Sequence, residues 1–561
     1  MAIKKHFYII AVLSVLFTLV IQLDLTKAII FDDYLSTRQI SGVNYYLSLI
    51  NESSKGNWQL GSPYLSEWRF QPYLYPALNI NAAGLVKRAL GLDIKTYALL
   101  MGYSAIFVLV FLLITAFLNI FNFHYFGYLA ATFYIFYPRH IEWQRTLSPE
   151  INFIPLALFL VFYFSRWKFW IREVGLGILT GALFYFYPYY WTFVLALIGM
   201  SDLWEFWRQR KIIWMHLYKY LIIAVLAPWY LAHLWQLHQL PYYKESIIRI
   251  GALYSRFPAG LYTQAVLLAS LAIFYFFKKY FARQLADSGF KENLDKIAAG
   301  LLASLAVLNQ QAVTGMQLEF NSHYLPVILL FLAAFWSRLV FVLIKAGSFY
   351  KKILIIFAFL ISIGAIANKI YIVSGPAYQK NYVGGRADEV VNWFLENKIR
   401  DKVVYAPEDL GDDINLWTDN YLYFHPGQEL QLMPTAEIID RFTYFDITNR
   451  NITDHLLESQ TMVFGMTFIE KMQKDNLINK LKSLVSGKEF APADLAQSTE
   501  YDFEPIYRKR NNPDLAEFTR YLKKYNVNYL VYRQKDRDSI YSAVSGKIVF
   551  EDKDFIIKQK N

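Results

Sequence analysis

The chain has 561 residues, of which 55% are hydrophobic and 18% aromatic, and its mean hydropathy is +0.24. Apolar stretches of nearly twenty residues recur through the first two-thirds, which excludes an ordinary soluble enzyme and favours a polytopic α-helical membrane protein. The net charge of +11 belongs to residues 1–373, with about 31 Lys and Arg against about 16 Asp and Glu; this excess is typical of cytoplasmic membrane loops and argues against a nucleic-acid partner.

The first apolar segment, near residues 7–23, follows Lys4 and Lys5 and ends without a small-residue cleavage site. It predicts an uncleaved signal anchor whose N-terminus is cytoplasmic. Further spans are predicted at 97–118, 123–138, 151–166, 174–187, 189–204, 216–236, 261–277, 297–314, 324–341 and 353–373. Every long predicted inner loop is basic, as the positive-inside rule requires, and only the short one near 119–122 is neutral. We therefore expect a multi-pass plasma-membrane protein with about eleven spans.

The hydropathy divides the chain into two domains. Residues 1–373 form the predicted transmembrane domain, with a long outer loop at 24–96, and residues 374–561 form a soluble extracytoplasmic α/β domain. In that second domain, apolar residues at helical spacing predict a helix over 386–398. Residues 401–407 and 527–534 read as strands, and 547–559 as a hairpin that turns at 551–554.

Two adjacent carboxylates, Asp32 and Asp33, follow the first span in the stretch AIIFDDYLSTRQ (28–39). Neighbouring carboxylates disfavour each other's ionised form, so such a pair suits a general base that takes a proton from a hydroxyl or amine nucleophile. It also suits a divalent cation such as Mg²⁺ or Mn²⁺, which prefers oxygen ligands. The chain has no cysteine, so a thiolate metal site is excluded. A base and a metal site both remain open at this pair.

This arrangement resembles the GT-C glycosyltransferases, among them aminoarabinose transferase and the protein O-mannosyltransferases. The likeness covers roughly residues 1–373 and consists of an early outer carboxylate pair, a long first outer loop, many spans and a C-terminal outer domain. It implies transfer of a sugar from a polyprenyl-phosphate donor to an acceptor on the far side of the membrane. Because this chain has Asp-Asp where the members it most resembles have Asp-Glu, either Asp32 or Asp33 could be the base.

The first outer loop supplies two more candidates. Glu67 and Arg69 lie among aromatic residues in GNWQLGSPYLSEWRFQPYLYP (56–76). Such aromatics suit a belt at the membrane interface, and they also suit stacking on a sugar face. We expect Glu67 and Arg69 to contact substrate.

The remaining candidates lie near later span ends. The stretch YPRHIEWQRT (137–146) gathers four polar side chains on the predicted outer face, against the positive-inside trend: Arg139, His140, Glu142 and Arg145. Arg binds phosphate oxygens in a bidentate manner, so this cluster predicts a site for a lipid-linked phosphate, with ordinary lipid headgroups as the alternative ligand. Glu319 and His323, before the tenth span, are predicted contacts to phosphate or acceptor.

These patterns together predict a membrane glycosyltransferase with a polyprenyl-phosphate sugar donor, a glycan, lipid or protein acceptor, contacts to membrane lipids and no nucleic acid. One carboxylate would remove the acceptor's proton while the polyprenyl phosphate leaves against Arg139, Arg145 and His323, which implies inversion at the anomeric carbon. A lipid or saccharide transporter or flippase is the main alternative; few charges within the spans and no paired, interrupted segments argue against it. An inactive scaffold and a lipid-linked oligosaccharide ligase are further alternatives.

Overall fold

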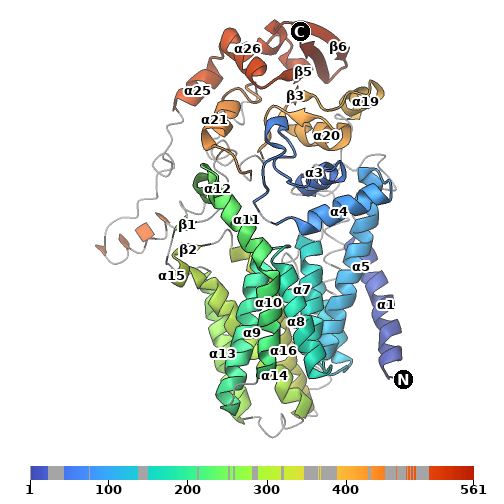
Figure 1. Cartoon of the computed structure of the whole chain (residues 1–561), viewed down its shortest axis with the longest axis vertical. Coiled ribbons are helices and arrows are strands. Elements are labelled where there is room, and N and C mark those ends of the chain that lie inside the picture. The colour runs from blue at the N-terminus through green and yellow to red at the C-terminus, as the bar shows by residue number, and fades with distance from the viewer. Residues whose placement is uncertain are drawn as a thin grey trace.

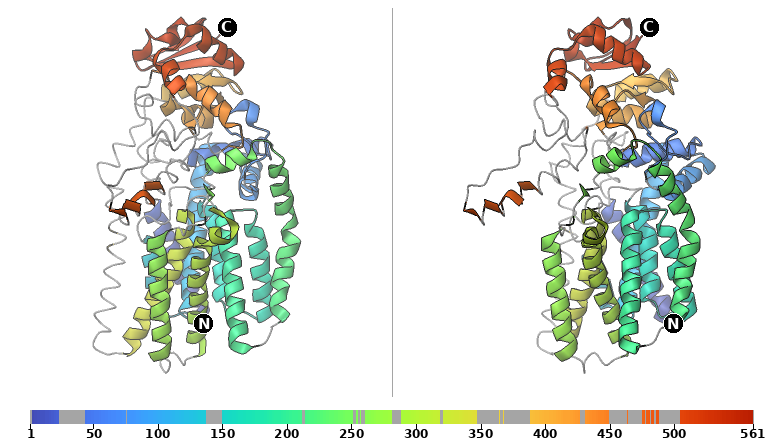
Figure 2. Two further views of the ribbon diagram at one scale, coloured as in Figure 1. Left: turned by 90° about the vertical axis from the view of Figure 1, so that its left-hand side faces the viewer. Right: turned by 60° about the vertical axis from the view of Figure 1, so that its left-hand side comes forward.

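The computed structural model describes most of the chain in separate ranges. These are residues 2–22, 43–74, 76–136, 149–210, 214–250, 253–254, 256, 260–280, 288–317, 321–346, 388–426, 431–448 and 504–560, with single residues or short runs at 364, 367, 463 and within 475–487. A helical bundle forms one end of the molecule and the C-terminal domain the other (Figure 1). The N-terminus lies at the end of the bundle away from the C-terminal domain (Figure 2).

The bundle consists of helices of 10 to 27 residues. They are α1 (Ala2–Ile21), α5 (Ile94–Ile120), α6 (Phe126–Phe136), α7 (Pro149–Phe164), α8 (Phe169–Leu183), α9 (Pro188–Gln209), α10 (Leu217–Leu226), α11 (Pro228–His238), α13 (Leu261–Tyr280), α14 (Ser288–Leu308) and α16 (Leu325–Ala346). Each predicted span within the described residues coincides with a helix or a helix pair, whereas the span predicted at 353–373 lies outside them.

Three of these helices, α5, α13 and α16, are long and apolar enough to cross a membrane, among the residues that the structure describes. A fourth candidate is the pair α10 and α11, which bends by 43° at a break before Pro228. Proline lacks the N–H that would continue the helix, so the bend follows from the sequence. A single interruption of this kind does not contradict the expectation of no paired, interrupted segments. The total of about eleven spans stays a prediction.

Small residues allow the bundle helices to approach closely. A Cβ on Gly181 of α8 would lie 2.4 Å from Leu226 Cδ1 of α10, and one on Gly300 of α14 would lie 2.0 Å from the Phe331 ring of α16. Small residues of this kind are typical of packed membrane helices, because backbones must come close where lipid provides no hydrophobic driving force. The apolar core of the bundle forms one continuous cluster from α1 to α16.

The C-terminal domain contains a five-stranded mixed sheet in the order β4-β3-β5-β7-β6. Its strands are β3 (Val403–Tyr405), β4 (Tyr421–Leu422), β5 (Val527–Arg533), β6 (Gly546–Glu551) and β7 (Phe555–Lys560). The accompanying helices are α19 (Asp388–Glu396), α20 (Glu408–Thr418), α21 (Thr435–Thr443), α25 (Glu504–Asn511), α26 (Leu515–Lys524) and the short α27 (Ile540–Ala543). The predicted helix at 386–398, both predicted strands and the closing hairpin are thereby confirmed.

Part of the first outer loop belongs structurally to the C-terminal domain. Helices α3 (Val43–Ser54) and α4 (Leu78–Ala89) lie below the sheet domain (Figure 1). Leu422 N donates to Tyr64 O at 2.7 Å, which adds the loop to the end of β4. Tyr64 also stacks on His425 with ring centroids 3.7 Å apart. Apolar residues of the loop and of the sheet therefore share one core.

A buried arginine is one of several groups that connect this unit to the end of α11, beside hydrogen bonds such as Thr435 N to Glu245 Oε2 at 3.1 Å. Arg249 of α12 (Tyr243–Ile250), which follows α11, is 3% exposed. Its guanidinium donates to the carbonyls of Gln431 at 2.7 Å and Met433 at 2.9 Å, and to Thr435 Oγ1 at 2.7 Å. Three acceptors around one fixed, planar group define the position of the loop before α21.

Candidate functional site

Most residues of the predicted catalytic centre lie outside the described residues. These are Asp32, Asp33, Arg139, His140, Glu142, Arg145 and Glu319. The structure does describe the helix ends from which their segments start and to which they return. Those ends lie next to one another, as three contacts show.

The first contact joins α1 to α6: the rings of Phe17 and Phe136 lie 5.0 Å apart, edge to face. The two helix ends that precede residues 23–42 and residues 137–148 are therefore neighbours. The second contact joins α6 to α16, because Tyr134 Oη donates to Pro326 O at 2.8 Å.

The third contact joins α7 to α9, where the rings of Phe153 and Tyr190 lie 5.4 Å apart. The two helices on either side of residues 137–148 thus pack against other helices of the bundle: α6 against α16, and α7 against the first turn of α9. All of these helix ends face the C-terminal domain (Figure 1).

His323 lies in the same region, within η4 (Asn321–Tyr324) just before α16. Its Nδ1 is hydrogen-bonded to the Tyr187 hydroxyl, and its ring stacks on Tyr189 at a centroid distance of 4.8 Å. The neighbouring Tyr324 hydroxyl pairs with Thr192 Oγ1 at 2.8 Å. The break at Pro188, which starts α9, presents Tyr187 and Tyr189 to the imidazole. The ring is thereby held in a defined orientation by aromatic neighbours.

Glu67 lines a cavity of about 680 Å³ between the first outer loop and α21 of the C-terminal domain. Glu67 Oε2 lies 3.3 Å from Arg441 Nη2, and the Arg441 side chain is fully buried. Arg441 also bonds Glu437 Oε1 at 2.9 Å, and that oxygen accepts from Trp68 Nε1 at 2.9 Å. Carboxylates beside an aromatic side chain are the groups with which proteins hold polyhydroxylated ligands.

The far wall of this cavity carries a second charged pair. Asp440 accepts a hydrogen bond from the Tyr525 hydroxyl at 2.6 Å and pairs with Lys524. Burial acts to raise the pKa of Asp440, but hydrogen bonds from Lys524, Tyr525 and Tyr521 hold it below its usual value. The Arg441 guanidinium lies 3.8 Å above the Tyr525 ring. This carboxylate is therefore ionised at neutral pH.

Arg69 lies outside the residues that line this cavity. Its Nε is 3.7 Å from Glu52 Oε2, and its guanidinium lies over the rings of Phe70 at 4.6 Å and Tyr421 at 5.4 Å. It thereby connects the first outer loop to β4. The structure brings Glu67 and Arg69 to the junction with the C-terminal domain, whereas His323 lies at the helix ends of the bundle.

Sequence reasoning missed the C-terminal half of the cavity. Glu437, Asp440 and Arg441 occupy one face of α21 at helical spacing, which is a readable signal of a charged surface. Their partner Glu67 lies more than 350 residues away, and nothing local in the sequence links the two. Among the described residues, no group of three or more His, Asp or Glu side chains could hold a metal ion.

No family model matches the chain, and no curated protein matches its sequence. Among solved structures, the chain is similar to ArnT from Cupriavidus metallidurans bound to undecaprenyl phosphate, with 10% sequence identity and a TM-score of 0.40. The alignment covers 92% of this chain and 93% of that one. At this level of likeness, fold family and function are to be decided from the chain's own residues.

Proposed function

We propose that this chain is a GT-C-type membrane glycosyltransferase that moves a sugar from a polyprenyl-phosphate donor to an extracytoplasmic acceptor. The observation that supports it most is the convergence of helix ends around His323. The segments that carry the predicted base and the predicted phosphate-binding cations start from the contact between Phe17 and Phe136. A base and a cation cluster in one place are what the reaction needs.

Chain length is compatible with this arrangement. Arg139 follows Phe136 by three residues and Arg145 precedes Pro149 by four, so each is tethered within roughly 14 Å of a described helix end. Asp32 follows Ile21 by eleven residues, which gives it a reach of up to about 36 Å. The predicted base can therefore reach the predicted cations without any change in the bundle.

In the proposed reaction, Asp32 or Asp33 takes the proton of an acceptor hydroxyl or amine. The acceptor atom attacks the anomeric carbon in line, and the bond from that carbon to the phosphate oxygen breaks with its electron pair on the phosphate. Arg139, Arg145 and His323 compensate the charge on the departing polyprenyl phosphate. A single displacement of this kind inverts the anomeric carbon. We assign acceptor recognition to the cavity lined by Glu67 and Trp68.

One observation favours the alternative of a lipid or saccharide transporter. The 43° break between α10 and α11 is the kind of interruption that transporters place at substrate sites. Among the described helices only this pair passes as a broken span, and inverted-repeat transporters carry such breaks in corresponding positions of both halves. A turnover assay separates the two functions.

The test uses purified full-length protein in lipid nanodiscs with a panel of polyprenyl-phosphate sugars. Release of polyprenyl phosphate and transfer to hydroxyl and amine acceptors are measured, with and without EDTA to test Mg²⁺ or Mn²⁺ dependence. The catalytic variant, Asp32→Asn or Asp33→Asn, should lose roughly 10²- to 10⁴-fold in kcat. Asp24→Asn is the matched control and should keep its activity. The proposal fails if no donor turns over, or if both variants remain fully active.

A further inference from the structure

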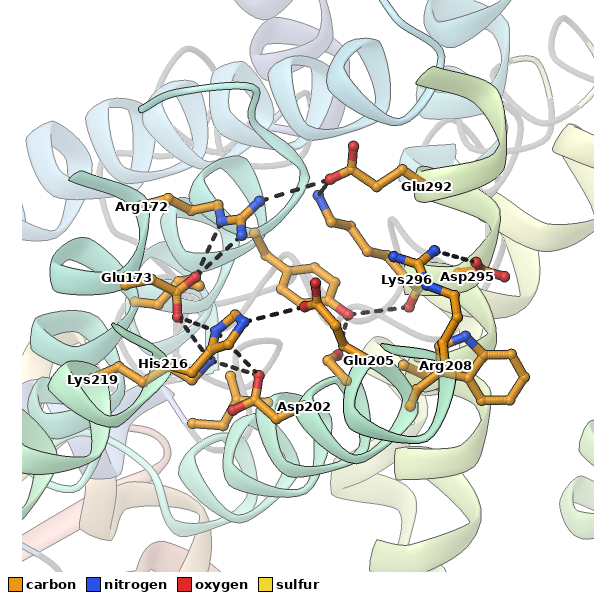
Figure 3. A pocket seen from close by; sticks show the side chains of 16 residues that line it. Arg172, Glu173, Asp202, Glu205, Arg208, His216, Lys219, Glu292, Asp295 and Lys296 are labelled. Atoms are coloured by element: carbon orange, nitrogen blue, oxygen red, sulfur yellow. Dashed lines mark hydrogen bonds and ion pairs between the residues drawn. The ribbon is translucent and has the colours of Figure 1, made fainter. Parts of the chain in front are cut away.

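A second cavity lies at the opposite end of the bundle, away from the C-terminal domain and from the proposed glycosyl-transfer site. It has a volume of about 430 Å³ and is bounded by α7, α8, α9, α10 and α14 (Figure 3). Five basic and five acidic side chains line it. Its volume falls within the range of sites that hold small ligands.

The floor of the cavity is internally neutralised. Lys219, with a side chain 3% exposed, pairs with Glu173 Oε2 at 2.8 Å and with Asp202 Oδ1 at 2.8 Å. His216 Nδ1 lies 3.0 Å from the same oxygen of Glu173. Buried charges of this kind are stable only when paired, so these ion pairs hold α8, α9 and α10 together.

The rim differs from the floor. Glu292 of α14 lies between two cations, with Oε1 2.7 Å from Lys296 Nζ and 3.8 Å from Arg172 Nη1. Its side chain is 53% exposed, whereas those of Lys296 and Arg172 are 14% and 17% exposed. Because the Glu292 side chain is more than half exposed, its i,i+4 pair with Lys296 is weak. The two cations are thus held in place, while the anion between them is free to swing into solvent.

Exposed tryptophans place this rim at a membrane interface. Trp170 lies two residues before Arg172, Trp207 lies next to Arg208, and Trp214 lies two residues before His216; they are 62%, 63% and 72% exposed. Tryptophan is enriched at the level of lipid headgroups because one edge of its ring is polar and the rest apolar. The cavity therefore opens where the headgroups of the leaflet opposite the C-terminal domain lie.

We propose that this cavity binds the headgroup of a phosphatidylethanolamine molecule of that leaflet, with its phosphate between Arg172 and Lys296 in place of the Glu292 carboxylate. Phosphate offers more acceptor oxygens to these two donors than a carboxylate does, and Arg172 keeps Nη1 for it, because its Nε and Nη2 lie 3.3 Å and 3.2 Å from Glu173 Oε1. The ammonium group faces Glu205, a carboxylate of the lining whose Oε2 lies 3.2 Å from His216 Nε2. A zwitterion suits a lining with equal numbers of acidic and basic side chains better than a purely anionic group does.

The test measures binding to the purified, delipidated full-length protein by calorimetry. The probes are short-chain phosphatidylethanolamine, a diacylglycerol with the same chains, and phosphorylethanolamine, which is the headgroup alone. We expect the lipid to bind at least tenfold more tightly than the diacylglycerol and than the free headgroup. A free headgroup that binds as tightly as the lipid would instead assign the cavity to a soluble phosphate ester and overturn the lipid assignment.

Variants distinguish a ligand-binding role of this cavity from a role in holding the helices together. Glu292→Gln removes the competing carboxylate and should tighten lipid binding several-fold, a gain that a merely damaged protein does not show. Lys296→Gln should weaken binding about tenfold, and Lys279→Gln, a cation at the same end that does not line the cavity, should leave it unchanged. If Glu292→Gln weakens binding as Lys296→Gln does, or if both leave it unchanged, the cluster only holds helices together.

Discussion

Replacing Arg249 by methionine tests how the C-terminal domain is fixed to the bundle. Methionine keeps much of the apolar stem but removes the donors to Gln431 O, Met433 O and Thr435 Oγ1. A hydrogen bond to a charged donor contributes about 1.5–3 kcal/mol. Because the three bonds share one guanidinium, they act as a unit rather than additively. Each buried acceptor left without its donor costs about 1–3 kcal/mol, so we expect about 3–5 kcal/mol for the unit.

The assay is amide hydrogen exchange of the purified protein, followed at residues 431–435 and 243–250. A loss of 3–5 kcal/mol in local opening free energy should accelerate exchange there by about 10²- to 10⁴-fold. Arg256→Met is the matched control, since Arg256 is an exposed arginine that donates to Ala312 O on the bundle. Unchanged exchange at 431–435 in the Arg249 variant would refute the assignment of this side chain as a connecting group.

Three further outcomes are expected. Tyr187→Phe removes the hydroxyl on His323 and should lower donor turnover about tenfold; combined with His323→Gln it should add little, because the two side chains act through one contact. Gly300→Ala forces a methyl group to within 2.0 Å of the Phe331 ring and should lower the thermal stability by about 1–3 kcal/mol, whereas Gly199→Ala in α9, with nothing within 4 Å of its Cβ, should not. Burial acts to raise the pKa of Asp412, but the charge and hydrogen bond of His425 hold it below its usual value. The stabilisation by the Asp412 carboxylate is therefore complete above its unfolded pKa and is lost as the pH falls through its lower folded pKa. Acid should thus separate Tyr64 from His425 in the wild type, whereas the Asp412→Asn variant should not respond to pH. Tyrosine fluorescence of single-site reporters measures this.

The positions of the bundle helices could be predicted because apolar runs are local signals. Their ends could not be read from hydropathy alone. Helix α14 begins at Ser288, nine residues before the predicted span at 297, and α9 continues to Gln209, five residues beyond the predicted end at 204. Because these extensions are polar, we infer that α14 and α9 project beyond the apolar layer. They carry half of the ten charged side chains that line the charged cavity: Glu205, Arg208, Glu292, Asp295 and Lys296.

The strands of the C-terminal domain were also readable, since β5 is almost continuously buried and rich in Val and Tyr. The contact between the C-terminal domain and the predicted first outer loop could not be read from the sequence. Asn415 Nδ2 donates to Pro63 O at 2.9 Å, and Glu67 meets Arg441 at 3.3 Å. Both contacts join residues about 350 or more positions apart, and a single sequence contains no signal for pairing at that distance. Sequence therefore singled out Glu67 without indicating what it touches.

The core that the loop shares with the C-terminal sheet links the position of that domain to the position of the predicted base. The segment with Asp32 and Asp33 runs from α1, which packs in the bundle, to α3, which packs with the sheet of the C-terminal domain. The segment with Arg139 and Arg145 runs between α6 and α7, both of which lie in the bundle. A shift of the C-terminal domain would thus move one attachment point of the predicted base while leaving the predicted cations in place. Since a misplacement of about 1 Å can cost about 10²-fold in rate, Arg249→Met should reduce turnover even at temperatures where the variant remains fully folded, and Arg256→Met should not.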